Sequence, residues 1–380
     1  MPIRWKGASG ASVKTVHYKR SAESTLEIVK AAVRTAAGTL RVLYLLAFQP
    51  QTPLALPSTG NFPLLGITPN YLVYYNGWGG QSNPALLCYD RNWLSVGNLT
   101  LNVTSSPSSA MAASIGNYAL FTGGYNASGT PVATTYAVSN ALVRSNPTVL
   151  SKARGLAGAG NCGSIQAVIG GGDTSTGATM VPSAVVNAYS PTLALSTPTA
   201  LSVARVAPAG LSGDTYAMFA GGTDASVVQK LTVEAYGTTL ARTVCASLSA
   251  NAFSNIMYGY VGFSDYFVIS SGSGIYQVYN KSLVMTTIIS SPIPGQSQSA
   301  CATADRKRAL FMGFTAAKVP VVVSMDSTLT IRTERATSPV VQNATGIGFQ
   351  NWVAFAKGTY YNEAGSGVYN HAFTRYRYIA

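Results

Sequence analysis

The chain has 380 residues, 37 of them glycine and 22 tyrosine, but only 10% of the residues are charged. Soluble domains usually carry charge on about 25% of their residues, so neutral polar groups must cover most of this surface. Hydrophobic residues make up 47% of the sequence, which supplies a core and argues against disorder. With only 2 histidines, the chain lacks the material for a metal centre of several histidine ligands, and we expect no metal and no cofactor.

The net charge of +13 is concentrated near the N-terminus. Residues 1–45 contain eight Lys or Arg and two Glu, a net +6, and the remaining 335 residues contribute +7. A basic arm can bind phosphate groups or an acidic protein surface. The competing interpretation is a solvated, mildly basic surface.

The four cysteines are far apart and match no zinc-binding spacing. We expect buried free thiols at Cys88, Cys162, Cys245 and Cys301, as in a protein that folds in a reducing cytoplasm. The first ten residues lack the apolar core of a signal peptide. The apolar run over residues 42–48 is shorter than the roughly 18 residues that cross a bilayer, so no membrane span is expected.

A repeated segment extends along most of the chain. Each copy begins with Asn or Asp, continues with an apolar run and ends with Gly or Gly-Gly. Asn or Asp suits a tight turn, the apolar run matches a strand buried on both faces, and glycine permits a positive φ and close backbone approach. The copies begin 40 to 53 residues apart, at Asn70, Asn117, Asn161, Asp214, Asp265, Asp305 and Asn351.

Two further markers follow within these units. Residues 189–193 (YSPTL) and 236–240 (YGTTL) place a polar turn between two large apolar residues, which predicts a hairpin between outer strands. Residues 150–155 (LSKARG) are echoed by residues 201–206 and 248–252. Their small side chains predict an innermost strand close to a central axis.

Four strands per unit, repeated in sequence, form the pattern of a β-propeller. The combined markers resemble kelch repeats from about residue 60 to residue 380, although Leu mostly replaces the usual Trp in the second half of each unit. The resemblance implies an all-β fold, a seven-bladed kelch-like propeller over residues 63–380. Six blades are the alternative if the first or last copy is incomplete, and the way the ring closes stays open.

A different module precedes the propeller. Residues 19–29 and 33–43 repeat at a spacing of 14 residues, which favours short hairpins, with an amphipathic helix over residues 22–37 as the alternative. Residues 1–48 resemble segments at the N-termini of structural proteins of tailed bacteriophages. The resemblance implies a basic anchoring module, with candidate residues Trp5, Lys6, Lys19, Arg20, Arg34 and Arg41. Residues 49–62 contain three prolines and are expected to form a stiff linker.

Three enzyme classes that use propellers find little support. A copper oxidase of the kelch class needs two histidine ligands, and of the two histidines only His371 falls in the predicted propeller. A sialidase needs Ser-x-Asp-x-Gly-x-Thr-Trp turns, which are absent. A glycosidase needs two carboxylates about 5 to 10 Å apart, for which Asp173 and Asp224 are the candidates, against the interpretation that both are solvated loop residues. We therefore expect no enzymatic activity.

The loops after the glycine pairs are better candidates for recognition. They carry Trp78, Tyr125, Asn126, Tyr360 and Tyr361. Aromatic faces combined with neutral hydrogen-bonding groups suit neutral sugars and protein contacts. The alternative is that these aromatic rings pack between blades.

Together the two resemblances imply a non-enzymatic virion protein of a tailed bacteriophage, such as a tail fibre, a spike or a surface decoration. Its N-terminal module would bind other virion structural proteins, and its propeller, alone or as a homo-oligomer, would bind a host-surface glycan or protein. The main alternative is a bacterial secreted or surface lectin-like propeller that binds carbohydrate. A basic arm that touches nucleic acid inside a capsid is a third interpretation, and nucleic acid is not the partner we expect.

Overall fold

The structure is a computed structural model of the chain. It describes residues 12–20, 26–34, 40–45, 48–56, 63–76, 85–100, 108–249, 259–270, 274–291, 293, 299–315, 317–334, 336, 340–341, 344–356, 359–361, 367–369 and 372–378. For residues 12–20, 26–34, 40–45, 76, 85, 100, 359–361 and 367–369 the description covers the backbone. Every regular element in this part of the chain is a β-strand.

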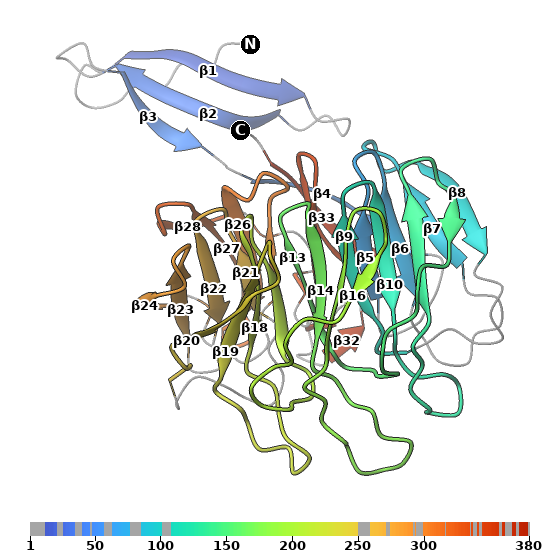
Figure 1. Ribbon diagram of the computed structural model, residues 1–380. Coiled ribbons are helices and arrows are strands. Elements are labelled where there is room, and N and C mark those ends of the chain that lie inside the picture. Colours follow the sequence, from blue (N-terminus) through green and yellow to red (C-terminus); the bar gives the residue numbers. More distant parts are fainter. Residues whose placement is uncertain are drawn as a thin grey trace.

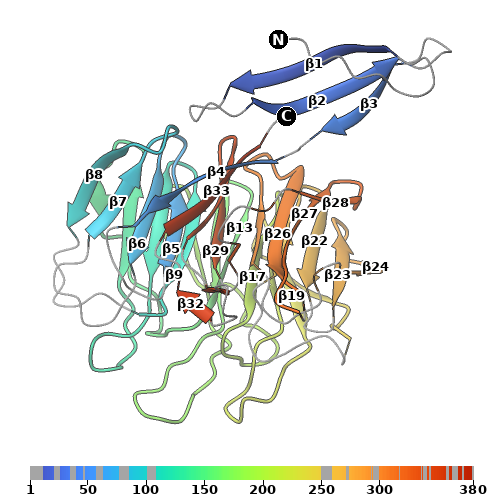
Figure 2. The same ribbon diagram turned by 180° about the vertical axis from the view of Figure 1, so that it is seen from behind.

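Seven four-stranded antiparallel sheets surround a common axis as the blades of a propeller (Figures 1 and 2). Blade I consists of β5 (Pro63–Ile67), β6 (Leu72–Asn76), β7 (Ala85–Tyr89) and β8 (Ser95–Thr100), from the axis outward. Blade II consists of β9 (Met111–Ile115), β10 (Tyr118–Thr122), β11 (Thr135–Ser139) and β12 (Arg144–Ser145). Blade III consists of β13 (Gly158–Cys162), β14 (Gln166–Gly170), β15 (Val186–Tyr189) and β16 (Leu195–Ser196). The all-β, seven-bladed fold predicted from the repeats is confirmed.

The remaining blades follow the same order. Blade IV consists of β17 (Ala209–Ser212), β18 (Tyr216–Ala220), β19 (Val233–Gly237) and β20 (Arg242–Cys245). Blade V consists of β21 (Tyr260–Gly262), β22 (Tyr266–Ser270), β23 (Ile275–Asn280) and β24 (Met285–Ser290). Blade VI consists of β25 (Ser299–Ala302), β26 (Arg308–Phe314), β27 (Pro320–Asp326) and β28 (Ile331–Thr333). Blade VII consists of β29 (Thr345–Phe349), β30 (Trp352–Ala356), β33 (Ala372–Tyr378) and β4 (Phe48–Ala55).

Strand exchange closes the ring. The outermost strand of blade VII is β4, which pairs with β33 so that Pro50 lies opposite Tyr376 and Phe48 opposite Tyr378. The expectation of a linker over residues 49–62 is therefore wrong for residues 49–55, and the propeller begins at Phe48. Proline lacks a backbone N–H and is tolerated on an edge strand, which is why Pro50 and Pro53 do not prevent pairing.

The glycine pairs behave as the sequence predicts. Each pair has a positive φ at both positions: 66° and 99° at Gly123 and Gly124, 72° and 111° at Gly171 and Gly172, and 63° and 95° at Gly221 and Gly222. The backbone also approaches closely, because a Cβ built on Gly123 would lie 2.5 Å from the carbonyl oxygen of Arg154. The pairs directly follow the second strand of blades II, III and IV.

In blades III, IV and V the tyrosines of the hairpin marker connect each blade to the segment that leads into it. Their side chains are fully buried, and their hydroxyls donate to backbone carbonyls at 2.7 to 2.9 Å: Tyr189 to Thr148, Tyr236 to Thr199 and Tyr279 to Ala246. The predicted hairpin between the outer strands is confirmed, and the Leu at its end has a positive φ, for example 63° at Leu193.

The innermost strands are not where the third marker predicts them. Residues 150–155 belong to the connection between blades II and III, and the innermost strand of blade III begins at Gly158. The small-residue requirement is met instead by β13 (GAGNC), β17 (AGLS) and β25 (SACA). A Cβ on Gly160 would overlap the carbonyl of Leu211. The arginines of the marker, Arg154 and Arg205, are 0% exposed and hold the connections to the blades.

The three N-terminal strands form a separate sheet. It consists of β1 (Ser12–Arg20), β2 (Leu26–Arg34) and β3 (Leu40–Leu45), with β2 in the middle and both neighbours antiparallel to it. The antiparallel pairing expected of hairpins is confirmed, and residues 26–34 of the alternative helix form β2 instead. The sheet lies outside the ring of blades in both views (Figures 1 and 2).

Chain direction defines two faces of the propeller. One face, the loop face, carries the loops between the second and third strands of each blade and the connections between blades. The opposite face, the hairpin face, carries the tight turns between the first and second and the third and fourth strands. Because β4 is antiparallel to β33, the chain enters β4 from the hairpin face, and β33 ends at that same face.

All four thiols are free and buried, as the sequence predicts. Burial raises the pKa of Cys88 and Cys162 to about 11 and that of Cys245 to about 12. These thiols therefore stay protonated at neutral pH. The described residues contain no helix that is long and apolar enough to span a bilayer.

Candidate functional site

The loop face of blades II to IV presents a repeated position. Tyr125, Asp173 and Thr223 each directly follow a glycine pair. Each forms a β-bridge with the connection that leads into its own blade: Tyr125 with Ser108, Asp173 with Gly155 and Thr223 with Val206. In blades II to IV the repeat thus places one side chain, different in each blade, at an equivalent position on the loop face.

Tyr125 spans blades II and III. Its hydroxyl donates to Oδ2 of Asp173 at 2.6 Å, and its ring lies where a Cβ on Gly155 would be. Burial and the neighbouring Asp173 carboxylate raise the pKa of Tyr125 above its ordinary value. The half-buried ring therefore packs between blades, which is the alternative that the sequence left open, and it still contributes part of its surface to the loop face.

Both oxygen atoms of the Asp173 carboxylate accept hydrogen bonds. Asp173 is 4% exposed and accepts hydrogen bonds from Tyr125, from the N–H and hydroxyl of Ser175 at 3.0 and 2.7 Å, and from the N–H of Val181 at 2.7 Å. Burial alone would raise its pKa, but these hydrogen bonds outweigh burial and lower the pKa below its ordinary value. A carboxylate held ionised in this way is poorly suited to donate a proton.

Asn126 and Asp224 close their own loops. Oδ1 of Asn126 accepts the N–H groups of Ser128 and Thr130 at 3.0 and 2.9 Å. Oδ1 of Asp224 accepts the corresponding N–H groups of its own loop, both at 2.9 Å, and its Oδ2 lies 2.7 Å from the Lys230 ammonium. The structure brings Asp173 to Tyr125 and Asp224 to Lys230, so the two carboxylates considered for glycosidase chemistry have separate partners.

We expect Tyr125→Phe to lower the free energy of unfolding by about 1 kcal/mol, since one hydrogen bond to a buried carboxylate is lost. Urea denaturation of Tyr125→Phe, Asp173→Asn and the double variant measures the coupling between the two side chains. Strictly additive effects in this cycle would contradict the hydrogen bond.

The other predicted binding residues map to the same face. Tyr360 and Tyr361 lie on β31 (Thr359–Tyr361), which pairs with β32 (Gly367–Tyr369) between β30 and β33 on the loop face of blade VII. Trp78 lies outside the described residues, as do Trp5 and Lys6 of the N-terminal module. Blades VII, I and II are neighbours in the ring, so the chain topology places these loops on adjoining blades. Within the described residues, no three His, Cys, Asp or Glu side chains gather as a metal site.

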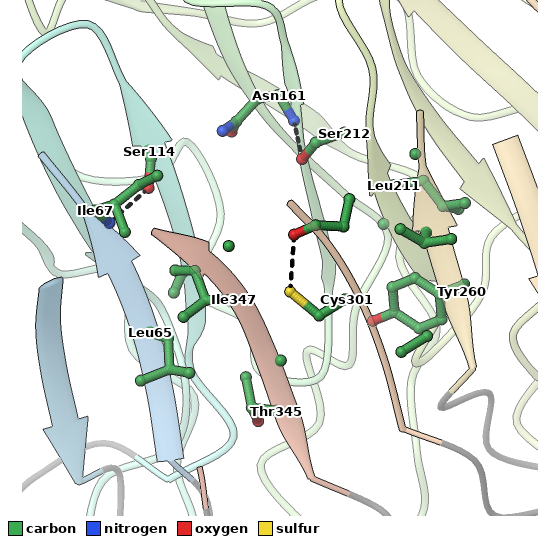
Figure 3. A pocket seen from close by; sticks show the side chains of 18 of the residues that line it. Leu65, Ile67, Ser114, Asn161, Leu211, Ser212, Tyr260, Cys301, Thr345 and Ile347 are labelled. Atoms are coloured by element: carbon green, nitrogen blue, oxygen red, sulfur yellow. Dashed lines mark hydrogen bonds between the residues drawn. The ribbon is translucent and has the colours of Figure 1, made fainter. Parts of the chain in front are cut away.

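A central channel runs along the propeller axis (Figure 3). It has a volume of about 440 Å³, and all seven innermost strands contribute to its wall. Hydroxyls connect neighbouring innermost strands: Ser114 accepts the N–H of Ile67 at 2.9 Å, and Ser212 accepts the N–H of Asn161 at 2.9 Å. Sequence reasoning missed this channel, although the small-residue segments before each Asn or Asp repeat were a usable signal.

This arrangement defines the protein as a seven-bladed β-propeller with an added N-terminal sheet. No protein-family model matches the sequence, and no curated protein matches it. Among solved structures, a structure of a streptogramin B lyase is similar, with a TM-score of 0.55 and 10% sequence identity over 87% of this chain and 98% of that chain. At this identity the similarity shows the fold alone.

Proposed function

We propose that the chain is a non-enzymatic virion protein of a tailed bacteriophage, with kelch-like repeats, that displays its propeller for host-surface recognition. The observation that carries the proposal is the direction of the chain at blade VII. The N-terminal sheet leads into β4 at the hairpin face, whereas the loops with the predicted binding residues belong to the loop face. An anchor on one face leaves the opposite face available to a host glycan or protein.

The loops of blades II to IV support a binding role because they are organised in advance. Asn126, Asp173 and Asp224 each fix their own loop through backbone N–H groups. Loops that are ordered before binding lose less conformational entropy when a ligand binds. The carboxylates that could have served a glycosidase are used for this purpose, which supports a binding protein rather than an enzyme.

The N-terminal sheet supplies the proposed contact to other virion structural proteins. Of the candidate anchoring residues, Lys19 and Arg20 lie on β1, Arg34 on β2 and Arg41 on β3. In the backbone register Lys19 pairs with Glu27 and Arg41 with Val33. The sheet therefore carries basic residues on every strand, as a surface for an acidic partner would.

The test separates anchoring from recognition. Replacing Lys19, Arg20, Arg34 and Arg41 by glutamine is expected to lower incorporation into particles at least tenfold, while the purified protein still binds host cells. Replacing Tyr360 and Tyr361 by serine is expected to leave incorporation unchanged and to reduce host-cell binding. Immunodetection on purified particles and cell-adsorption assays measure the two effects.

A matched control removes the same charge from the propeller, by replacing Arg91, Lys152, Lys281 and Lys307 with glutamine. Incorporation that falls equally in the control and in the N-terminal variant would refute a specific anchor. Host binding without any incorporation of the unmodified protein would favour the lectin-like alternative instead.

A further inference from the structure

Arg306 lies at the hairpin-face end of the channel. It belongs to the turn between β25 and β26 in blade VI and has a φ of 54°. Its N–H donates to the carbonyl of Thr303 at 2.9 Å, and its own carbonyl accepts the N–H of Ser264, in the equivalent turn of blade V, at 3.2 Å. The backbone of Arg306 is thus held between two blades.

The Arg306 side chain extends beyond the neighbouring blade. Its Nη1 lies 2.7 Å from Oδ1 of Asp214, in the turn between β17 and β18 of blade IV, so the ion pair passes blade V. The charge also acts on blade III. Burial raises the pKa of Cys162, at the end of β13, and the positive charge of Arg306 opposes that rise. The guanidinium therefore lies over the end of the channel and not over blade VI alone.

The ion pair is unequally exposed to solvent. The Arg306 side chain is 20% exposed and the Asp214 side chain 54% exposed. Water screens the more exposed charge more effectively, and a narrow channel with low-dielectric walls focuses the remaining field. Arg306 is the one charged residue among the described residues of the channel wall. Arg306 therefore supplies the positive charge that a ligand at the hairpin-face end of the channel would meet.

The rest of the wall is neutral and polar enough to bind hydroxyl groups. Oδ1 of Asn161 is buried and has no hydrogen-bond partner among the described residues. Figure 3 shows the Asn161 side chain directed away from Ser212, whose hydroxyl accepts the Asn161 N–H. A buried amide oxygen without a donor is destabilising until a ligand or water satisfies it.

We propose that the channel binds small hydroxy acids. The ligand carboxylate takes the place of Asp214 on the Arg306 guanidinium, and a ligand hydroxyl donates to Oδ1 of Asn161. The channel volume of about 440 Å³ falls within the roughly 300 to 1,000 Å³ of small-molecule sites. This inference goes beyond host recognition and does not depend on a virion location.

Isothermal titration calorimetry of the full-length protein tests it with two probes of one ring type. D-Glucuronate is expected to bind at least tenfold more tightly than D-glucose, because the carboxylate adds a charge-assisted hydrogen bond. Arg306→Gln is expected to remove this preference. Asp214→Asn is expected to raise the affinity for D-glucuronate severalfold, because it removes the competing carboxylate.

Arg306→Gln and Asp214→Asn are expected to change the affinity for D-glucuronate in opposite directions. If the ion pair were only a structural bridge, both variants would change this affinity in the same direction. The matched control is the exposed pair of Lys281 and Asp265 in blade V, 3.5 Å apart. Both side chains are exposed and neither lines the channel wall, so Lys281→Gln and Asp265→Asn remove the same charges without changing a wall residue and are expected to leave D-glucuronate binding nearly unchanged.

Equal affinity for the two sugars, or no binding of D-glucuronate at millimolar concentration, would overturn the proposal. If Arg306→Gln fails to fold, Asp214→Asn alone tests the proposal. A D-glucuronate affinity that is lower or unchanged in Asp214→Asn would also overturn it. Neither result depends on particles or host cells, so failure here leaves the proposed virion function untouched.

Discussion

Replacing Glu234 by glutamine is expected to lower the free energy of unfolding by about 3 to 5 kcal/mol, the usual effect of removing one partner of a buried ion pair. Glu234 and Arg205 are both 0% exposed, with Oε2 and Nη2 2.7 Å apart. The second carboxylate oxygen accepts the N–H of Ser202 at 2.7 Å and lies 3.7 Å from Nη1 of Arg242. Glutamine would leave the Arg205 charge uncompensated in the core, and guanidinium denaturation measures the loss.

Blade III provides the comparison for this prediction. At the equivalent position, Nη2 of the buried Arg154 donates to Oδ1 of Asn187 at 3.0 Å and to the carbonyl of Ile169 at 3.2 Å. Burial lowers the pKa of Arg154 to about 10, and no carboxylate of the described part of the chain forms an ion pair with it. Asn187→Asp is therefore expected to act in the opposite direction and to stabilise the protein at neutral pH.

A second control combines Glu234→Gln with Arg205→Met. Removing the unpaired cation is expected to recover part of the loss, because replacing both members of a buried pair is much less destabilising than replacing one. A loss below about 1 kcal/mol in Glu234→Gln alone would show that neutral oxygen atoms suffice for Arg205, as they do for Arg154 in blade III.

The sequence predicts features whose cause is local. Gly171 and Gly172 adopt positive φ angles. Other residue types rarely adopt them, so the glycines must stand at these two positions. The Tyr189 and Leu193 hairpin depends on five consecutive residues, so its pattern is visible in each copy. Counting such copies was enough to establish seven blades, because each blade needs one set of turns.

Features that join distant residues were missed or misassigned. The segments that contain Arg154 and Arg205 were assigned to innermost strands because of their small residues. The sequence does not show that the two arginines bind Asn187 and Glu234 in the blades that follow. Tyr125 resembled a free binding residue because its partner Asp173 is 48 residues away. The channel arises only when seven strands meet, so no single segment predicts it. Long-range pairing also hid β4, whose prolines suit a linker as well as an edge strand.

A chain that begins at residue 57, and so lacks β4, is expected to lose its cooperative unfolding transition. Phe48 is 0% exposed and packs in a core cluster with Val353, Phe355 and Tyr376. Removing a buried Phe side chain alone destabilises by about 3 to 5 kcal/mol. The lost strand also ends the pairing with β33, so the total approaches the roughly 5 to 15 kcal/mol that stabilises a typical domain.

The matched control begins at residue 47, which removes β1 to β3 and keeps β4 complete. Its thermal transition, followed by circular dichroism, is expected to resemble that of the full chain. A chain that begins at residue 51 lacks Phe48, and its blade VII is expected to be destabilised. A synthetic peptide of residues 47–57 should restore the transition in the chain that lacks β4, since an added strand can complete an open sheet edge.

The opposing view is that direct contacts between blades VII and I hold the ring without β4. The hydroxyl of Thr345 donates to the carbonyl of Pro63 at 3.0 Å, and Nε2 of Gln350 donates to the carbonyl of Pro69 at 3.1 Å. Each such bond contributes about 1 kcal/mol, less than the burial of Phe48 alone. A cooperative transition of unchanged midpoint in the chain that begins at residue 57 would show that these contacts, with inter-blade packing, close the ring and that β4 only covers its edge.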